Sequence, residues 1–507
     1  MNRAESLSRL TTEGQWDVLV IGGGATGLGA ALDAASRGYR AAVVEQGDFA
    51  KGTSSRSTKL AHGGVRYLRS GEIGFVRGAL RERGLMERNA PHLVRRLAFV
   101  IPVYRVLDSA IFGFGLKAYE WLSGSASFGR STMISAAETR RLLPTVQPKN
   151  LRGGVVYYDG QFDDARYAIA LAASAEDHGA AAVNYVRVLE LLKRGSRISG
   201  ARVRDSETGK EFSIEARVVI NATGVFADKV RRLDDPNIEP LLTTSSGVHL
   251  VLDRRFLPGE HALMVPKTTD GRVFFALPWH GHVLIGTTDE PREVVELEPR
   301  PLAKEVEFLL ATASRYFEKP VSRSDVLSVF TGLRALVKSR SGQSTASLSR
   351  DHRIVVSPSG LVSVTGGKWT THRQMAEEAV DRAAAVAGLA PTRSRTESIS
   401  LRDAPPETAA EYKALLQADP RLAAKLHDRT PNVAGEVVWA ARHEMARTVE
   451  DVLARRTRIL FLDARAALEC APAVAALMAK ELDRPSAWEE QQVREFSALA
   501  QGYLPAP

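Results

Sequence analysis

Three glycines that follow an apolar segment constrain this chain more than any other feature. Residues 17–21 read Asp-Val-Leu-Val-Ile, which predicts a short buried strand, and Gly22, Gly24 and Gly27 follow with the spacing G-x-G-x-x-G. Residues 28–37 are rich in alanine and predict a helix. In such a unit the first glycine permits a tight turn, the second lets the backbone approach a pyrophosphate, and the third lets helix and strand pack closely. The segment therefore predicts a Rossmann-like α/β unit that binds a dinucleotide at the start of the helix.

A carboxylate follows at the position where such a unit binds ribose. Residues 39–44 predict a second strand, and Glu45 stands at its end, 23 residues after Gly22. It can accept hydrogen bonds from the adenosine ribose hydroxyls, and its charge would repel the 2′-phosphate of NADP. The alternative is a glycine-rich turn with no ligand, which leaves Glu45 and the alanine-rich helix unexplained.

Length, cysteine content and charge set wider limits. A chain of 507 residues exceeds what one hydrophobic core usually serves, so two or three domains are expected. Cys470 is the single cysteine, which excludes an intrachain disulfide and a cysteine-based zinc or iron–sulfur site and fits a reducing cytoplasm. No metal-ligand spacing is found, no apolar stretch reaches the roughly 18 residues of a membrane span, and residues 1–14 lack the apolar run of a signal peptide. The net charge of +9 favours an anionic partner.

Residues 53–67 separate FAD from NAD, which the glycine motif alone does not. Their sequence is TSSRSTKLAHGGVRY, in which small and hydroxylated residues precede a glycine pair and a basic–aromatic pair. An NAD-binding domain would usually continue into another plain βα unit. A polar loop here can enclose the second half of a larger cofactor, so the sequence predicts FAD.

Several motifs together resemble the FAD-dependent glycerol-3-phosphate dehydrogenases, the membrane-associated aerobic enzymes of bacteria and mitochondria. The matching segments are VIGGGATGLGAALDAASRG, TSSRSTKLAHGGVRYL, NATGVFAD (221–228), IGTTD (285–289), TGLRAL (331–336), GGKWTTHRQMAE (366–377) and HEMARTVEDVLARRTRILFLD (443–463). Two positions depart from the family pattern: Ala335 stands where proline is common after the arginine, and His372 stands where tyrosine is usual.

The resemblance implies oxidation of sn-glycerol 3-phosphate to dihydroxyacetone phosphate by hydride transfer to FAD, with the electrons passed to a membrane quinone, either ubiquinone or menaquinone. FAD is expected to bind non-covalently. The residues expected to contact it are Gly22, Gly23, Gly24, Ala25, Thr26, Gly27, Glu45, Thr53, Ser54, Ser55, Ser57, Thr58, Lys59, His62, Gly63, Gly64, Val188, Ala222, Thr223, Gly224, Gly366, Gly367, Lys368, Trp369 and Thr370.

The family pattern also supplies a substrate pocket. Arg66, Tyr67, His249, Arg334 and Lys368 are expected to line it, because a phosphate dianion is bound best by several cations and by forked arginine in particular. His249 and Arg334 are the expected catalytic residues, since an imidazole titrates near working pH and a guanidinium can stabilise a developing alkoxide. The alternative for His249 is a hydrogen-bonded histidine inside a strand.

The expected fold class is α/β: a Rossmann-like FAD-binding domain, an antiparallel-sheet substrate domain and a C-terminal all-helical domain. Residues 15–75, 150–235 and 350–390 are expected to form the discontinuous FAD-binding domain. Residues 76–149 and 236–349 are assigned to the substrate domain. Residues 396–507 are assigned to the helical domain, for which packing or oligomerisation is the default role.

A basic segment beside apolar aromatic residues favours contact with a membrane. Residues 76–105 carry seven arginines and two glutamates, and residues 109–121 bring isoleucine, phenylalanine, tyrosine and tryptophan together. Such a segment suits an anionic lipid surface, and the alternative is a basic helix face beside ordinary core. We therefore expect a cytoplasmic protein peripherally associated with the inner face of the cell membrane, with a homodimer left open.

Three other functions compete with this assignment. The first is a glycerol-3-phosphate oxidase that uses O₂, and the second is an amino-acid or amine oxidase of the same fold. The third is a flavoprotein that binds RNA, but no lysine and arginine stripe with interleaved stacking aromatics is found, so no nucleic-acid partner is expected.

Overall fold

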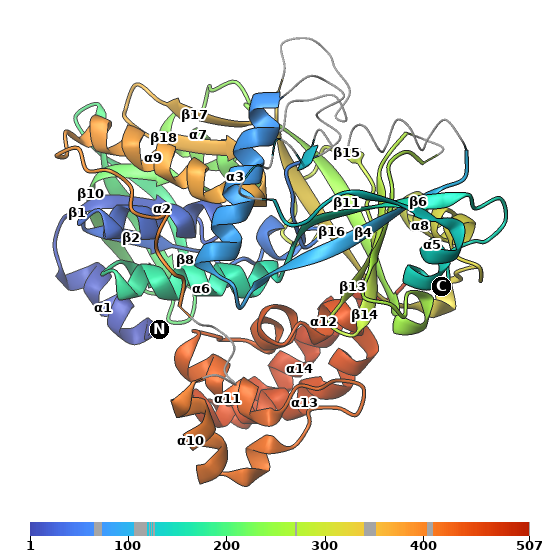
Figure 1. The fold of residues 1–507 in the computed structure, drawn as a ribbon. Coiled ribbons are helices and arrows are strands. Elements are labelled where there is room, and N and C mark those ends of the chain that lie inside the picture. The colour runs from blue at the N-terminus through green and yellow to red at the C-terminus, as the bar shows by residue number, and fades with distance from the viewer. Residues whose placement is uncertain are drawn as a thin grey trace.

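Two regions built on β-sheets lie side by side, and a helical region formed by the C-terminal part of the chain lies below them (Figure 1). The computed structural model describes residues 1–64, 73–105, 119, 120, 122, 124, 127–268, 271–338, 351–402 and 409–505. This arrangement confirms the predicted fold class of Rossmann-like unit, largely antiparallel second sheet and C-terminal helices.

The first sheet has a parallel core in the order β18-β10-β1-β2-β7, to which β17 is added in antiparallel orientation. A meander of β8 and β9 extends β10. The strands of this sheet are β1 (Trp16–Ile21), β2 (Ala41–Val44), β7 (Ala181–Val183), β8 (Val186–Arg194), β9 (Arg197–Asp205), β10 (Glu211–Asn221), β17 (His352–Val356) and β18 (Val362–Gly366). The carboxyl ends of its parallel strands meet at one edge, where ligands of such sheets bind.

Apolar side chains at alternate positions along the strands point to opposite faces of this sheet, and both faces are buried. One face packs against α2 (Ala25–Ser36), α6 (Asp164–Asp177) and α9 (His372–Ala387), which are rich in alanine and therefore approach the strands closely. The other face is covered by α1 (Arg3–Thr12) and by the meander. A short helix, α7 (Ala227–Asp234), follows β10.

The second sheet is mainly antiparallel, except that β12 pairs with β4 in parallel. Its strands are β3 (Leu60–Ala61), β4 (Val94–Val103), β5 (Thr132–Ser135), β6 (Gly153–Phe162), β11 (Leu242–Asp253), β12 (Ala262–Val265), β13 (Phe274–Trp279), β14 (His282–Gly286), β15 (Glu290–Arg292) and β16 (Val326–Val337). The helices α3 (Ile73–Asn89), α5 (Ala136–Leu142) and α8 (Ala303–Tyr316) flank it, and α8 closes one apolar face.

Two strands of the second sheet fall inside segments predicted for the FAD-binding domain. These are β3, within residues 15–75, and β6, within residues 150–235. They are hydrogen-bonded to each other, and β6 also pairs with β4. The domain boundaries remain a proposal. Because β3 and β6 belong to the second sheet, we assign both strands to the proposed substrate domain.

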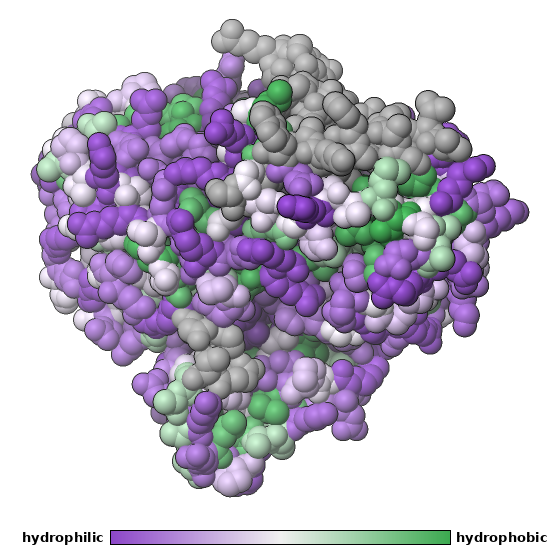
Figure 2. Space-filling view, viewed as in Figure 1, coloured by the Kyte–Doolittle hydropathy of each residue, from purple (hydrophilic) through white to green (hydrophobic). Residues whose placement is uncertain are grey.

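The C-terminal helices pack on the face of the second sheet that α8 leaves open. They are α10 (Ala410–Ala418), α11 (Ala434–His443), a π-helical turn (Asp451–Arg456), α12 (Ile459–Leu462), α13 (Ala464–Glu481) and α14 (Ser486–Ala500). Their apolar side chains share one core with Val251, Trp279 and Phe330 of the sheet. Within the described residues no helix has the length and hydropathy needed to cross a bilayer. On the face shown in Figure 2, hydrophilic residues dominate what is coloured, and hydrophobic residues form small separate areas.

Candidate active site

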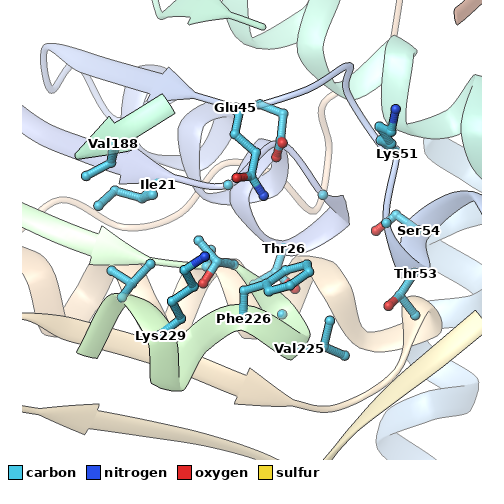
Figure 3. A pocket seen from close by; sticks show the side chains of 18 of the residues that line it. Ile21, Thr26, Glu45, Lys51, Thr53, Ser54, Val188, Val225, Phe226 and Lys229 are labelled. Carbon is cyan, nitrogen blue, oxygen red and sulfur yellow. The ribbon is translucent and has the colours of Figure 1, made fainter. Parts of the chain in front are cut away.

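A cavity of about 550 Å³ opens at the carboxyl ends of β1, β2 and β10. Glu45 lies on one side of it and Val225, Phe226 and Lys229 on the opposite side (Figure 3). Twelve residues predicted to contact the cofactor line this cavity: Gly22, Gly24, Ala25, Thr26, Glu45, Thr53, Ser54, Val188, Ala222, Thr223, Gly224 and Gly366.

The glycines of the motif are required by close backbone packing. A Cβ atom on Gly22, which has φ +113°, would lie 2.7 Å from the carbonyl oxygen of Ala222. A Cβ atom on Gly27 would lie 1.9 Å from the carbonyl oxygen of Gly22, so helix α2 meets the end of β1 at a distance that no side chain permits. The amide of Ala25 at the start of α2 donates to Oγ of Ser54 at 2.9 Å, which brings the polar loop to the helix N-terminus.

A Gly27→Ala variant is expected to bind FAD more weakly and to be less stable by about 1–3 kcal/mol, because the added methyl must push α2 away from the turn after β1. The flavin absorbance per protein and the thermal midpoint measure both effects. Gly78→Ala is the matched control, since Gly78 also lies inside a helix, its Cβ position has no atom within 4 Å, and it does not line the cavity. If Gly27→Ala matched this control in FAD content and stability, the close approach would not matter.

His249 lies at the centre of the second sheet, on β11 between β14 and β16. Its ring stacks on Phe330 with centroids 4.9 Å apart, and its Nε2 lies 2.9 Å from Oγ1 of Thr58. On β14 a Cβ atom at Gly286 would lie 2.3 Å from the imidazole, so only glycine leaves room for the ring. Burial first, and then the positive charges of Lys59 and Arg334, hold the pKa of His249 well below 6.5. The imidazole is therefore neutral at neutral pH.

Arg334 on β16 is held as a fixed positive charge beside His249. Its guanidinium donates to the carbonyl oxygens of Ser246 at 2.8 Å and Thr288 at 2.9 Å, and to Oγ1 of Thr287 at 3.1 Å. A Cβ atom on Gly247 would lie 2.3 Å from this guanidinium, so glycine is needed here as well. Oxygens from two neighbouring segments thus hold the charge in place, which removes most of its side-chain freedom.

Lys368 belongs to the turn that follows β18, and this turn lies against the end of β16. A Cβ atom on Gly366 would lie 2.9 Å from the side chain of Val337, three residues after Arg334. The Lys368 ammonium lies 4.3 Å from the centre of the Phe75 ring. Arg66 and Tyr67 lie outside the described residues. The predicted cluster of Arg66, Arg334 and Lys368 around one phosphate therefore stays a prediction.

Known proteins resemble this chain over nearly its whole length. Residues 17–382 match the family described as FAD dependent oxidoreductase, and residues 381–493 match the C-terminal domain of alpha-glycerophosphate oxidase. The probable mitochondrial glycerol-3-phosphate dehydrogenase of Caenorhabditis elegans is 40% identical over 97% of this chain and 74% of its own length. The mitochondrial glycerol-3-phosphate dehydrogenase of Rattus norvegicus is 38% identical over 99% of this chain and 75% of its own length. The chain belongs to the FAD-dependent glycerol-3-phosphate dehydrogenase family.

Solved structures agree with this family assignment. The glycerol-3-phosphate dehydrogenase of Bacillus halodurans, complexed with FAD, superposes with a TM-score of 0.80 at 29% identity and covers 99% of this chain and 97% of its own. The L-alpha-glycerophosphate oxidase of Mycoplasma pneumoniae, with a TM-score of 0.57, 18% identity and coverage of 75% and 97%, shares the fold. The resemblance stated from the motifs is confirmed, and FAD is the cofactor of this flavoprotein.

The residues of the cavity fit the FAD of this family. Glu45 Oε2 accepts a hydrogen bond from the amide of Gly23 at 2.7 Å, and Oε1 accepts one from the amide of Gly47 at 3.0 Å, which fixes the carboxylate at the cavity wall. Oγ1 of Thr365 is buried, belongs to the cavity lining, and has no hydrogen-bond partner among the described residues. A ligand rich in polar groups would satisfy it.

The other predicted cofactor residues lie outside this cavity: Gly23, Gly27, Ser55, Ser57, Thr58, Lys59, His62, Gly63, Gly64, Gly367, Lys368, Trp369 and Thr370. Some of them join the segments around it. The indole of Trp369 donates to the carbonyl oxygen of Ser54 at 2.9 Å, and the amide of His62 donates to Oγ1 of Thr370 at 3.2 Å. The residues after β3 and the turn after β18 therefore lie together.

Several cavity residues were not predicted from sequence. Lys229 brings positive charge to the cavity, and Val225 and Phe226 form part of its wall (Figure 3). Lys51 lines the cavity too, but its ammonium lies 2.6 Å from the carboxylate of Glu450. Val225 and Phe226 directly follow the N-A-T-G turn, so a wider reading of that motif would have included them. Nothing in the sequence around Lys51 distinguishes it from a surface lysine.

Proposed function

We propose that this chain oxidises sn-glycerol 3-phosphate to dihydroxyacetone phosphate and passes the electrons to a membrane quinone. The observation that supports this most is the identity of 37–40% with curated glycerol-3-phosphate dehydrogenases over almost the whole chain. The neutral His249 beside the fixed charge of Arg334 suits the chemistry, since alcohol oxidation needs a proton acceptor and stabilisation of a developing alkoxide.

Different side chains serve hydride transfer, proton transfer and phosphate binding in this proposal. Bound FAD, held non-covalently, supplies the acceptor for the hydride that leaves C2. His249 takes the proton of the C2 hydroxyl, which its neutral ring is able to do at neutral pH. Arg334 stabilises negative charge that develops on the C2 oxygen, and Lys368, Arg66 and Tyr67 bind the phosphate group.

Anaerobic flavin bleaching tests this proposal. Purified yellow protein mixed with glycerol 3-phosphate is expected to lose its flavin absorbance, whereas glycerol and glycine leave it unchanged. Bleaching by glycine would instead indicate an amino-acid oxidase. Bleaching by glycerol would remove the requirement for the phosphate.

His249→Ala is expected to lower turnover at least tenfold while FAD content stays the same, because the proton acceptor is lost and no described contact of His249 forms the FAD cavity. Steady-state rates at several substrate concentrations, normalised to bound flavin, give the comparison. Unchanged turnover would remove His249 from the mechanism.

The electron acceptor is tested separately. With glycerol 3-phosphate in excess, a quinone analogue is expected to reoxidise the flavin faster than air does, and little peroxide forms. A peroxide yield close to one per substrate would favour the oxidase alternative. Ubiquinone and menaquinone analogues tested in parallel would distinguish the two quinone types.

We also propose a cytoplasmic location, with peripheral binding to the inner face of the membrane through residues 76–105. Arg77 and Arg81 on α3 line one groove with Arg88 and Arg96. Vesicles with and without anionic lipid are expected to differ in how much protein they sediment, and Arg77→Glu with Arg81→Glu is expected to remove that difference. If the variant sedimented with anionic vesicles as strongly as the unchanged protein does, the assignment would be contradicted. Light scattering of the purified protein tests the homodimer.

Two details of the membrane hypothesis are corrected by the structure. Tyr119, expected among the interfacial aromatic residues, is buried, and its hydroxyl donates to Asp159 at 2.8 Å. Arg83 is buried too and forms an ion pair with the same carboxylate at 2.8 Å, so the basic surface has fewer members than the seven arginines in the sequence. Residues 106–118 and Trp121 lie outside the described residues.

A further inference from the structure

Thr58 contacts the imidazole of His249, and the two residues that flank Thr58 in the sequence are both bound by one buried carboxylate, Asp164. Asp164, at the start of α6, accepts hydrogen bonds from the amide of Ser57 at 3.0 Å and from its hydroxyl at 2.7 Å. The Lys59 ammonium lies 2.7 Å from the same carboxylate. Thr58, between them, directs its hydroxyl to Nε2 of His249 at 2.9 Å. Because both flanking residues are bound to one carboxylate, the position of Thr58 is set by Asp164.

The C-terminal helical region supplies the next contact. Arg458, just before α12, donates from Nη2 to Asp164 Oδ1 at 3.0 Å and to the carbonyl oxygen of Ser55 at 3.1 Å. Arg458 is 2% exposed, and Lys59 and Asp164 are fully buried. The Arg458 guanidinium lies 4.6 Å from the centre of the Phe461 ring, and the Lys59 ammonium lies 5.5 Å from that ring. A buried cluster with this many contacts leaves the loop little freedom.

The contact between Thr58 and His249 distinguishes the two ring nitrogens. Nδ1 of His249 is buried and has no hydrogen-bond partner among the described residues, whereas Nε2 faces the Thr58 hydroxyl. The Thr58 hydroxyl can donate to Nε2 or accept from it, so the contact holds the ring in one orientation and links its tautomer to the direction of the hydroxyl.

We propose that Thr58 is the positioning residue of His249, held in place by Asp164 and, from the C-terminal region, by Arg458. The proposal rests on the role of His249 in the proposed function. It gives the C-terminal region a role beyond packing, because Arg458 bonds to Asp164 and to the carbonyl oxygen of Ser55 in the loop that positions the proton acceptor. Burial lowers the pKa of Lys59 to about 7, although the neighbouring carboxylate of Asp164 favours the charged ammonium.

Thr58→Val tests the hydroxyl, because it keeps the shape of the side chain and removes the hydrogen bond. The rate of flavin reduction at saturating glycerol 3-phosphate is expected to fall about tenfold, because one orienting hydrogen bond is lost. The dissociation constant of the substrate and the FAD content are expected to stay within about twofold, since Thr58 does not hold the phosphate. Thr58→Ser is expected to restore most of the rate.

Thr331→Val is the matched control, because its hydroxyl is buried on the neighbouring strand β16 without a partner among the described residues. It is expected to reduce flavin at the rate of the unchanged protein. A Thr58→Val rate equal to that of this control would overturn the proposal. So would a Thr58→Ser variant as slow as Thr58→Val, since the hydroxyl would then not be responsible.

Arg458→Gln tests the contribution of the C-terminal region, with the exposed Arg442→Gln as its control. In protein that retains FAD, Arg458→Gln is expected to slow flavin reduction severalfold without weakening substrate binding, and Arg442→Gln has no effect. If Arg458→Gln does not fold, the Thr58 pair still decides. Failure of the proposed function would look different, because the unchanged protein would then not bleach with glycerol 3-phosphate, or His249→Ala would keep its turnover.

Discussion

Arg334→Gln is expected to lower kcat/KM for glycerol 3-phosphate by roughly 10³-fold, or about 4 kcal/mol, because it removes the charge that we propose stabilises the developing alkoxide. The guanidinium is held by the carbonyl oxygens of Ser246 and Thr288 and lies 3.6 Å from Asp289. Since these contacts exist before substrate binds, the charge needs no reorganisation when negative charge develops. Steady-state kinetics with FAD-loaded protein measures the loss.

Two further variants separate charge from geometry. Arg334→Lys keeps one positive charge but cannot make the forked set of hydrogen bonds, so it is expected to recover only part of the activity. Arg272→Gln removes an arginine that pairs with Glu290 at 2.8 Å elsewhere on the same sheet, and it is expected to keep full activity. If Arg334→Gln retained more than about a tenth of the activity, the assignment of Arg334 to the reacting centre would be wrong.

The first strand, helix and second strand could be predicted because their signals are local. The helix begins at Ala25, three residues before the predicted start, since Thr26 and Gly27 already belong to its first turn. Glu45 was predicted at the cavity for the same reason: its position depends only on the length of this unit. The spacing between the glycine motif and Glu45 can be read from a short stretch of sequence.

The position of Lys59 could not be predicted in this way. Its motif suggested contact with the cofactor, but its ammonium is bound by Asp164, 105 residues further along the chain. Arg458 approaches the same loop across 403 residues, at the carbonyl of Ser55. Contacts at these separations are set by how the two sheets and the C-terminal helices pack, and a single sequence has no local pattern that encodes them. For the same reason the role of the C-terminal helices was not readable from residue chemistry.

Asp48→Asn is expected to destabilise the protein by about 3–5 kcal/mol and to weaken FAD binding, because it leaves two buried arginines without their shared carboxylate. Asp48 accepts hydrogen bonds from Arg455 at 2.5 Å and from Arg456 at 2.6 Å and 3.0 Å, and all three side chains are at most 2% exposed. The loop that begins at Asp48 carries Ser54, which bonds to the start of α2, so loosening it disturbs the cavity. The thermal midpoint is expected to fall by roughly 5 °C or more. FAD, followed by its fluorescence, is expected to be released faster than from the unchanged protein.

The pH dependence of stability gives an independent check on the same carboxylate. Burial alone would raise the pKa of Asp48, but the charges of Arg456 and Arg455 outweigh it and lower the pKa to about 2. A carboxyl group with a lowered pKa stabilises the fold at pH values above its unfolded pKa of about 4, and this stabilisation is lost as pH falls toward 2. The difference in stability between Asp48→Asn and the unchanged protein should therefore shrink as pH is lowered through that window. Asp177→Asn, which removes an exposed pair with Arg402, should change stability by less than about 1 kcal/mol at any pH. A difference for Asp48→Asn that stayed constant down to pH 2 would show that packing, not charge, holds the loop to the C-terminal helices.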